Sequence, residues 1–227
     1  MLFVHSPLLG PSSWARAAAL ARATGWQVSV PDLASATASP SPSWTRVVEQ
    51  AVVAGRSLAG TVAVVGHSGA GPMLPAITAG LFGQDKMTVF VDAAVPPIAD
   101  CHRPTRRQLQ MHDQQTAPDG FLMNWLDWWS DDVVQSLLPS VDDRAVLSRD
   151  MPSVPRVLYD EAVPVPRGWV NAKNAYLRLS SSYEPQRQFG IDNGWATAKV
   201  DGDHLSIFTD ASTVLAQVEL LIELLSQ

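Results

Sequence analysis

The sequence is poor in cysteine and in charge. It has one cysteine, Cys101, among 227 residues, so it cannot form an intramolecular disulfide, and a cysteine-based zinc site is disfavoured. Only 17% of the residues are charged, while 46% are hydrophobic. A single thiol suits a reducing compartment, and the composition predicts a folded chain with a rather uncharged surface.

The sequence also lacks a basic patch and a long apolar run. Its net charge is −6, and the cluster of Arg103, Arg106 and Arg107 is too small to reverse it, which argues against a nucleic-acid partner. No stretch approaches the roughly 20 apolar residues that span a bilayer, and the start, MLFVHSPLLG, lacks the charged region of a signal peptide. We therefore expect a soluble, cytoplasmic protein with no membrane span, and the oligomeric state stays open.

What the sequence does contain is an alternation of apolar strands and helices, within a length that suits one domain over residues 1–227. Strands are predicted at 1–4, 26–33, 61–65 and 86–91, and helices at 11–25, at 44–58 and after 68. Residues 34–43, ASATASPSPS, read as a loop. This order predicts a parallel sheet with helices on both faces.

Residues 61–72, TVAVVGHSGAGP, join an apolar strand to a tight turn. Glycines around Ser68 permit a strained backbone with positive φ and a helix packed close beneath it, although Ala70 replaces the last glycine of the pattern G-x-S-x-G. The segment predicts a nucleophile elbow with Ser68 as the nucleophile. A Gly/Ser turn without chemistry is the alternative.

The alternation lapses between residues 98 and 174, which are rich in tryptophan and proline. We expect this segment to form a mostly helical lid, inserted within the single domain, whose tryptophans face the Ser68 pocket. Adjacent residues on a helix point about 100° apart, so at most one of Trp128 and Trp129 should line the pocket centrally. Strands are predicted again at 175–180 and 195–200, followed by a last helix from about residue 210.

His204 is the predicted general base, because imidazole has a suitable pKa and the residue lies in VDGDHLSIF, between the last predicted strand and the last helix. We expect His67 to be structural and His5 to be structural or pocket-lining. The spacing of His102 and His112 fits no metal-ligand set. No metal and no other cofactor is therefore expected.

Four segments resemble the α/β-hydrolase family, and the likeness runs through nearly all of the chain. They are FVHSPLLGPSSW, similar to the family's H-G-x-x-G-S-x-x-x-W, the elbow VVGHSGAG, the strand VFVDAAVPP, and GDHLSIF, which looks like the family's G-x-H loop. The resemblance implies a three-layer α/β sandwich that starts at the family's third strand. Its mostly parallel sheet would have six strands with helices on both faces, and 98–174 would form the lid.

One departure from the family concerns the oxyanion hole. The resemblance implies a backbone N–H donor at the position of Pro7, which has none. The hole would then use the N–H groups of Leu8 and Gly69, or it would be incomplete. One such donor is worth roughly 3 to 4 kcal/mol of barrier.

The second departure concerns the acid that orients the histidine. The family places it after the strand that 175–180 matches, but serines 180–182 occupy that position and the nearest carboxylate is Glu184. Asp92, at the end of the strand after the nucleophile, is the competitor and the preferred candidate, because the sheet fixes its position.

The leading hypothesis is a serine hydrolase in which Ser68, His204 and Asp92 cleave an ester, thioester or lactone of a medium-sized apolar molecule. A lyase, cyclase or isomerase that uses His204 for proton transfer alone is the first alternative. The second is a binding protein without turnover. The fold cannot separate them.

Overall fold

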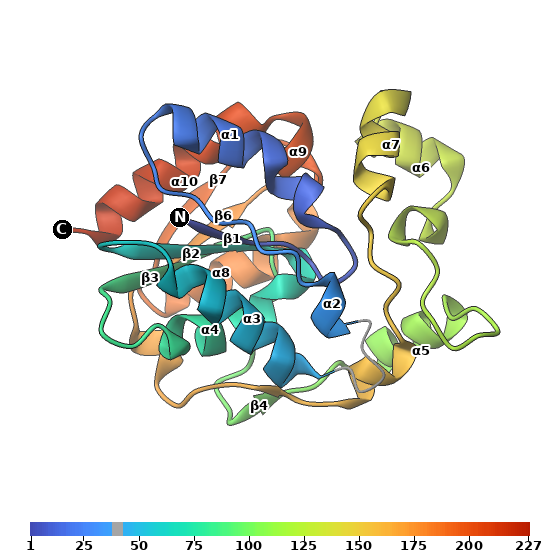
Figure 1. The fold of residues 1–227 in the computed structure, drawn as a ribbon, viewed down its shortest axis with the longest axis horizontal. Coiled ribbons are helices and arrows are strands. Elements are labelled where there is room, and N and C mark those ends of the chain that lie inside the picture. The colour runs from blue at the N-terminus through green and yellow to red at the C-terminus, as the bar shows by residue number, and fades with distance from the viewer. Residues whose placement is uncertain (38–42) are drawn as a thin grey trace.

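The computed structural model describes residues 1–37 and 43–227. Its main sheet has five parallel strands in the order β1-β2-β3-β6-β7 (Figure 1). The strands are β1 (Leu2–Val4), β2 (Val62–His67), β3 (Lys86–Val91), β6 (Asn174–Arg178) and β7 (Ala196–Lys199). The alternation of strands and helices in the sequence thus gives the predicted parallel sheet.

Alternate side chains of the central strands fill two separate cores. On β2, Ala63 and Val65 join one core, whereas Val62 and Val64 join the other. The five residues from Val62 to Gly66 are all buried, as expected for a parallel strand that helices cover on both faces.

Helices cover both faces of this sheet (Figure 1). One face carries η1 (Pro11–Trp14), α1 (Ala15–Ala23), α9 (Ser206–Thr209) and α10 (Ala211–Leu225). The other carries α2 (Ala34–Thr37), α3 (Trp44–Arg56), α4 (Leu74–Gly80) and α8 (Glu184–Asp192). None of the described helices is both long and apolar enough to cross a membrane.

The chain between β3 and β6 holds helical pieces and two very short strands. They are β4 (Cys101–His102), α5 (Arg106–Gln114), η3 (Trp125–Trp128), α6 (Asp131–Leu137), α7 (Val141–Ser148), η4 (Arg156–Asp160), β5 (Val163–Pro164) and η5 (Trp169–Asn171). Figure 1 shows α5, α6 and α7 beside the sheet and its helices. Trp169 packs on Phe90 and Trp195, so the end of this segment belongs to the core.

The sheet has five strands where six were predicted. The missing strand, 26–33, is reduced to one bridge, at which Ser29 pairs with Leu2. Ser29 bonds to Met1 and Phe3, but β1 ends at Val4 and Pro31 has no N–H to extend the ladder. Within the predicted loop 34–43, residues 34–37 form the short helix α2, and residues 38–42 lie outside the described part of the chain.

Candidate active site

Ser68 lies at a sharp turn between strand β2 and the 3-10 helix η2 (Ser68–Met73). Its φ is +56°, and among the described residues only Ser68 and Asp92 have positive φ without being glycine. The turn needs Gly71, since a Cβ there would lie 1.8 Å from the Ala94 carbonyl oxygen. Ala70 is accommodated because it points into the core. This is the geometry that the elbow pattern predicts.

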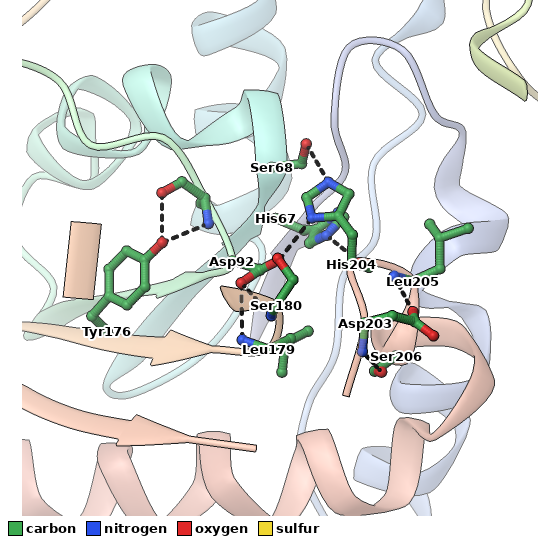
Figure 2. Close-up of polar contacts among 11 residues, drawn as sticks. His67, Ser68, Asp92, Tyr176, Leu179, Ser180, Asp203, His204, Leu205 and Ser206 are labelled. Carbon is green, nitrogen blue, oxygen red and sulfur yellow. Dashed lines mark hydrogen bonds and ion pairs between the residues drawn. The ribbon is translucent and has the colours of Figure 1, made fainter. Parts of the chain in front are cut away.

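Asp92 follows strand β3 directly, with φ +43° and no exposed surface. Its Oδ1 accepts hydrogen bonds from the backbone N–H groups of Leu179 and Ser180, at 2.9 and 3.0 Å. Its Oδ2 accepts one from the Ser180 hydroxyl, at 2.7 Å. The end of β3 is thereby tied to the end of β6, and the carboxylate is held in one orientation (Figure 2).

His204 joins the two residues. Its Nδ1 lies 2.8 Å from Asp92 Oδ2, and its Nε2 lies 2.9 Å from Ser68 Oγ (Figure 2). A carboxylate accepts hydrogen bonds, so the Asp92 contact places the imidazole proton on Nδ1 and leaves Nε2 free to accept the Ser68 proton. The structure therefore brings all three predicted residues into one hydrogen-bonded chain.

The loop that carries His204 is fixed on both sides. The Asp203 carboxylate accepts from Leu205 N–H at 2.7 Å, and Asp203 N–H donates to the Ser206 hydroxyl at 2.9 Å. His67 Nε2 lies 2.9 Å from the His204 carbonyl oxygen, which can only accept, so His67 is the donor. His67 is structural, as predicted, and it holds the backbone of the neighbouring imidazole.

Burial and hydrogen bonding set the protonation states of Asp92 and His67 beside His204. Burial alone would raise the pKa of Asp92, but the hydrogen bonds from His204 and Ser180 lower it below its usual value. Complete burial, with His204 nearby, lowers the pKa of His67 well below 6.5. At neutral pH the cluster thus contains an ionised Asp92 and a neutral His67.

Glu184, the competing carboxylate, lies in a different network. Glu184 is the first residue of α8, and its carboxylate accepts hydrogen bonds from Arg187 in the same helix. It also forms an ion pair with Arg178 at 3.0 Å. The hydrogen bond from Arg187 lowers the pKa of the Glu184 carboxyl. The carboxylate that contacts His204 is therefore that of Asp92.

The loop after β1 contains Pro7, at the position of the family's oxyanion donor, and Leu8, the candidate donor in its place. Pro7 has no N–H, and Leu8 N–H donates to the Ser6 hydroxyl at 3.3 Å. Ser6 is 3% exposed, and its Oγ would lie 3.2 Å from a Cβ placed on Gly69. Gly69 itself is in the first turn of η2, where backbone N–H groups have no helical partner. Ser6, Leu8 and Gly69 thus lie together beside Ser68.

Comparison with solved structures shows which fold this arrangement belongs to. Tomato methylketone synthase I with 2-tridecanone superposes with a TM-score of 0.72 at 15% identity, over 97% of both chains. An Arabidopsis methylesterase, MES16, gives 0.71 at 15% over 98% of both chains, and polyneuridine aldehyde esterase gives 0.69 at 16% over 98% of both. The chain has the α/β-hydrolase fold. No protein-family model and no curated protein matches the sequence.

Within this α/β-hydrolase fold, a cavity of about 560 Å³ opens beside Ser68 and His204. Trp125, Trp128 and Trp129 all border it. Trp128 and Trp129 can both do so because η3 ends at Trp128, and Trp129 has an extended backbone with φ −120° and ψ 154°. The two neighbours are not on one helix.

Three residues of this α/β-hydrolase site follow predicted strands, but the sequence assigned them no role. Ser180 follows the end of β6, and its hydroxyl donates a hydrogen bond to Asp92, a contact between two strand ends that no local pattern predicts. Tyr183 stacks on His204 with ring centroids 5.1 Å apart and planes within 4°. Ser6 also follows a strand, but its role depends on Leu8 and Gly69, which only the folded chain brings to it.

The remaining histidines take different places. His5 bonds to the Ser6 carbonyl through Nδ1 at 2.8 Å and accepts from Leu33 N–H through Nε2 at 3.1 Å, so it fixes the loop and does not border the cavity. His102 and His112 border the cavity. In the described part of the chain, no three histidine, cysteine or carboxylate side chains cluster as metal ligands would.

Proposed function

We propose that this protein is a serine hydrolase that cleaves an ester, thioester or lactone through an acyl-enzyme on Ser68. The observation that carries the proposal is the chain from Ser68 Oγ through His204 to Asp92, with contacts of 2.9 and 2.8 Å. A hydroxyl is a weak nucleophile unless a base takes its proton, and this geometry supplies the base and the group that orients it. The esterases among the structural neighbours support the same reading.

In the proposed reaction, the proton of Ser68 moves to His204 Nε2 while Oγ bonds to the acyl carbon. The tetrahedral oxyanion collapses and expels the leaving group, which receives that proton from His204. Water then attacks the acyl-enzyme, again through His204, and releases the acid with Ser68 restored. Asp92 keeps its charge throughout and stabilises the imidazolium.

The oxyanion would accept hydrogen bonds from Gly69 N–H and from the Ser6 hydroxyl. Ser6 already accepts from Leu8 N–H, and none of the described hydrogen bonds gives the Ser6 proton an acceptor. The Ser6 hydroxyl can therefore donate a hydrogen bond to the oxyanion while it accepts one from Leu8 N–H, and the second bond strengthens the first. This donor offsets the one that is missing at Pro7.

The substrate would be a medium-sized, uncharged and largely apolar molecule. The cavity of about 560 Å³ is bordered by tryptophan, methionine and leucine side chains, and none of the described lysines and arginines borders it. The segment 98–174 would serve as the lid, because it supplies Met111, Trp125, Trp128, Trp129 and Leu137 to the cavity lining. The lone, exposed Cys101 supports a reducing, cytoplasmic compartment.

The test is turnover of p-nitrophenyl esters of short and medium acyl chains. Wild type should hydrolyse them, and Ser68→Ala should lower kcat by roughly 10⁴ to 10⁶, because residues of a triad act as one unit. A Ser68→Ala variant with near-normal turnover would remove the covalent mechanism.

One observation favours a second function, proton transfer without an acyl-enzyme. The loop after β1 offers no free amide at Pro7 or Leu8, and tomato methylketone synthase I is among the structural neighbours. In that case activity on the true substrate would survive Ser68→Ala and would be lost in His204→Ala. Binding without either activity would indicate the non-catalytic alternative.

A further inference from the structure

Tyr183 lies beside the proposed nucleophile and base, but the reaction described above gives it no role. Its ring stacks on the His204 imidazole, with centroids 5.1 Å apart and planes within 4°. Its hydroxyl is hydrogen-bonded to the Ser68 side chain. All three residues border the cavity. A phenol therefore lies next to both groups that move the proton.

The backbone of Tyr183 is anchored to Asp92 through one serine. Tyr183 ends the 3-10 helix η6 (Ser181–Tyr183), and its N–H donates to the Ser180 carbonyl at 3.2 Å. The hydroxyl of the same Ser180 donates to Asp92 Oδ2 at 2.7 Å. On the other side, Glu184 is held by ion pairs with two arginines. Contacts before and after Tyr183 thus fix the segment from which its ring reaches the imidazole.

The protonation states decide which of the two hydroxyls donates. Burial raises the pKa of Tyr183, so its phenol keeps its proton at neutral pH. Ser68 Oγ donates its own proton to His204 Nε2, at 2.9 Å. In the bond between the two hydroxyls, Tyr183 is therefore the donor and Ser68 Oγ is the acceptor.

The stacking decides on which side of Ser68 this donor lies. Because the ring is parallel to the imidazole, a hydroxyl that also reaches Ser68 Oγ lies on the side of His204 Nε2. A leaving-group oxygen must come within reach of Nε2 to receive its proton. The oxyanion already has its proposed donors in Gly69 and Ser6. Tyr183 is therefore placed to meet the leaving group.

We propose that the Tyr183 hydroxyl donates a hydrogen bond to the leaving-group oxygen, and that the substrate is an ester of an aliphatic alcohol, lactones included. When Ser68 Oγ bonds to the acyl carbon it becomes an ester oxygen, which is a weaker acceptor. The phenol O–H then rotates toward the oxygen whose bond to that carbon breaks. His204 gives this oxygen its proton, and Tyr183 keeps its own.

The second donor narrows the substrate class of the proposed hydrolase, on which this inference rests. An alkoxide is a strong base and leaves only as it is protonated, so a hydrogen bond to its oxygen lowers the barrier. Thiolates and phenolates are stable anions that leave without this help. A thioester or an aryl ester would gain little from Tyr183.

The test compares ethyl hexanoate with p-nitrophenyl hexanoate, which share the acyl group and differ in the leaving group. The readout is kcat/KM, because it reports acylation and not the deacylation that the two esters share. A hydrogen bond to a group that carries charge changes a rate by about 10- to 100-fold. Tyr183→Phe keeps the stacked ring and should lower kcat/KM by about that factor for ethyl hexanoate, but by less than about threefold for p-nitrophenyl hexanoate.

Tyr176→Phe is the matched control. It also removes a buried phenol, but one that bonds to the Ala93 backbone and does not border the cavity. The ratio of the two kcat/KM values should stay at its wild-type level. Labelling with a fluorophosphonate, whose fluoride leaves as an anion, should be as fast in Tyr183→Phe as in wild type, which also shows that this variant is folded with an active Ser68.

Equal losses on both esters in Tyr183→Phe would show that the phenol only positions Ser68 or His204, and no loss on either ester would show that it does neither. Both results would overturn the inference and leave the hydrolase proposal standing. If folded wild type turned over neither ester, the hydrolase proposal would fail and this inference with it.

Discussion

At the scale of single residues, backbone strain is concentrated where the chemistry is proposed. Ser68 and Asp92 have φ of +56° and +43°, although neither is glycine. Each follows a buried strand, and Ala94 N–H bonds to the Ser68 carbonyl at 3.1 Å, which couples the two turns. Such conformations cost about 1 to 3 kcal/mol each and persist where surrounding contacts hold them. Here the contacts aim a hydroxyl and a carboxylate at one imidazole.

The identity of the orienting acid gives the first prediction. Asp92→Asn should lower kcat for any substrate by about 10⁴, because the amide no longer selects the tautomer with the proton on His204 Nδ1. Glu184→Gln should change kcat less than about threefold, because Glu184 contacts Arg178 and Arg187 instead. Steady-state kinetics of both variants provide the check. The opposite ranking would assign the role to Glu184, and two mild effects would indicate a Ser-His dyad.

A second residue-scale prediction concerns Ser6. If its hydroxyl meets the oxyanion, Ser6→Ala should lower kcat by about 10² with little change in KM, since one oxyanion donor is worth that much. Ser6→Thr keeps the hydroxyl and is the matched control. An Ala variant as active as the Thr variant would show that backbone amides alone stabilise the oxyanion.

At the scale of elements, the predicted lid is hydrogen-bonded to η1, at the end of the loop after β1. The Asp150 carboxylate, just past α7, accepts from Ser12 N–H at 2.7 Å and from the Ser12 hydroxyl at 2.6 Å. Gly10 makes room for it, because a Cβ there would lie 2.2 Å from that carboxylate. The loop that holds Gly10 also carries Ser6, so α7 is attached next to the proposed oxyanion donor.

We therefore predict that Asp150→Ala loosens α6 and α7 without unfolding the sheet. Hydrogen bonds to an ionised group are worth roughly 1.5 to 3 kcal/mol, so amides of residues 131–148 should exchange about tenfold faster or more. Asp142→Ala, on the exposed side of α7, is the control and should have a small effect. Unchanged exchange in Asp150→Ala would show that other contacts hold the lid, and hydrogen exchange with mass spectrometry measures both variants.

The strands of the sheet differ in how well the sequence predicts them. Strands β2 and β3 were predictable because their apolar runs end abruptly at residues that carry chemistry, and the same argument placed Ser68 and Asp92 at one edge of the sheet. The prediction of a strand at 26–33 was wrong, because the number of residues that can pair there depends on the adjacent strand. That strand, β1, is only three residues long, and a single bridge forms. His67 and His204 are 137 residues apart, so no local pattern could reveal their hydrogen bond.

At the scale of the whole molecule, buried neutral histidines link stability to pH. The folded state keeps His67 uncharged well below pH 6.5, whereas the unfolded chain takes up a proton near about 6.5. The stability that neutral His67 contributes is therefore fully present above about pH 6.5 and decreases as the pH falls, by about 1.4 kcal/mol per pH unit. Acid should weaken this fold before its carboxylates are protonated.

His67→Gln tests this link, because glutamine keeps an N–H donor near the position of Nε2 and does not titrate. Its free energy of unfolding, measured in urea at several pH values, should fall less steeply than that of wild type between about pH 6 and 4.5, by about 1.4 kcal/mol per unit. His5 also has a pKa lowered by burial, so part of the slope should remain. Parallel curves for the two proteins would mean that His67 is protonated in the folded state.

The central claim is that the fold activates Ser68, and labelling with a fluorophosphonate followed by intact-mass measurement tests it most directly. A serine that gives its proton to His204 attacks phosphorus, whereas an isolated hydroxyl does not. Wild type is predicted to gain the mass of a single adduct, and Ser68→Ala is predicted to gain none. A folded wild-type protein that shows no mass shift, or a Ser68→Ala variant that is labelled equally, would contradict the account.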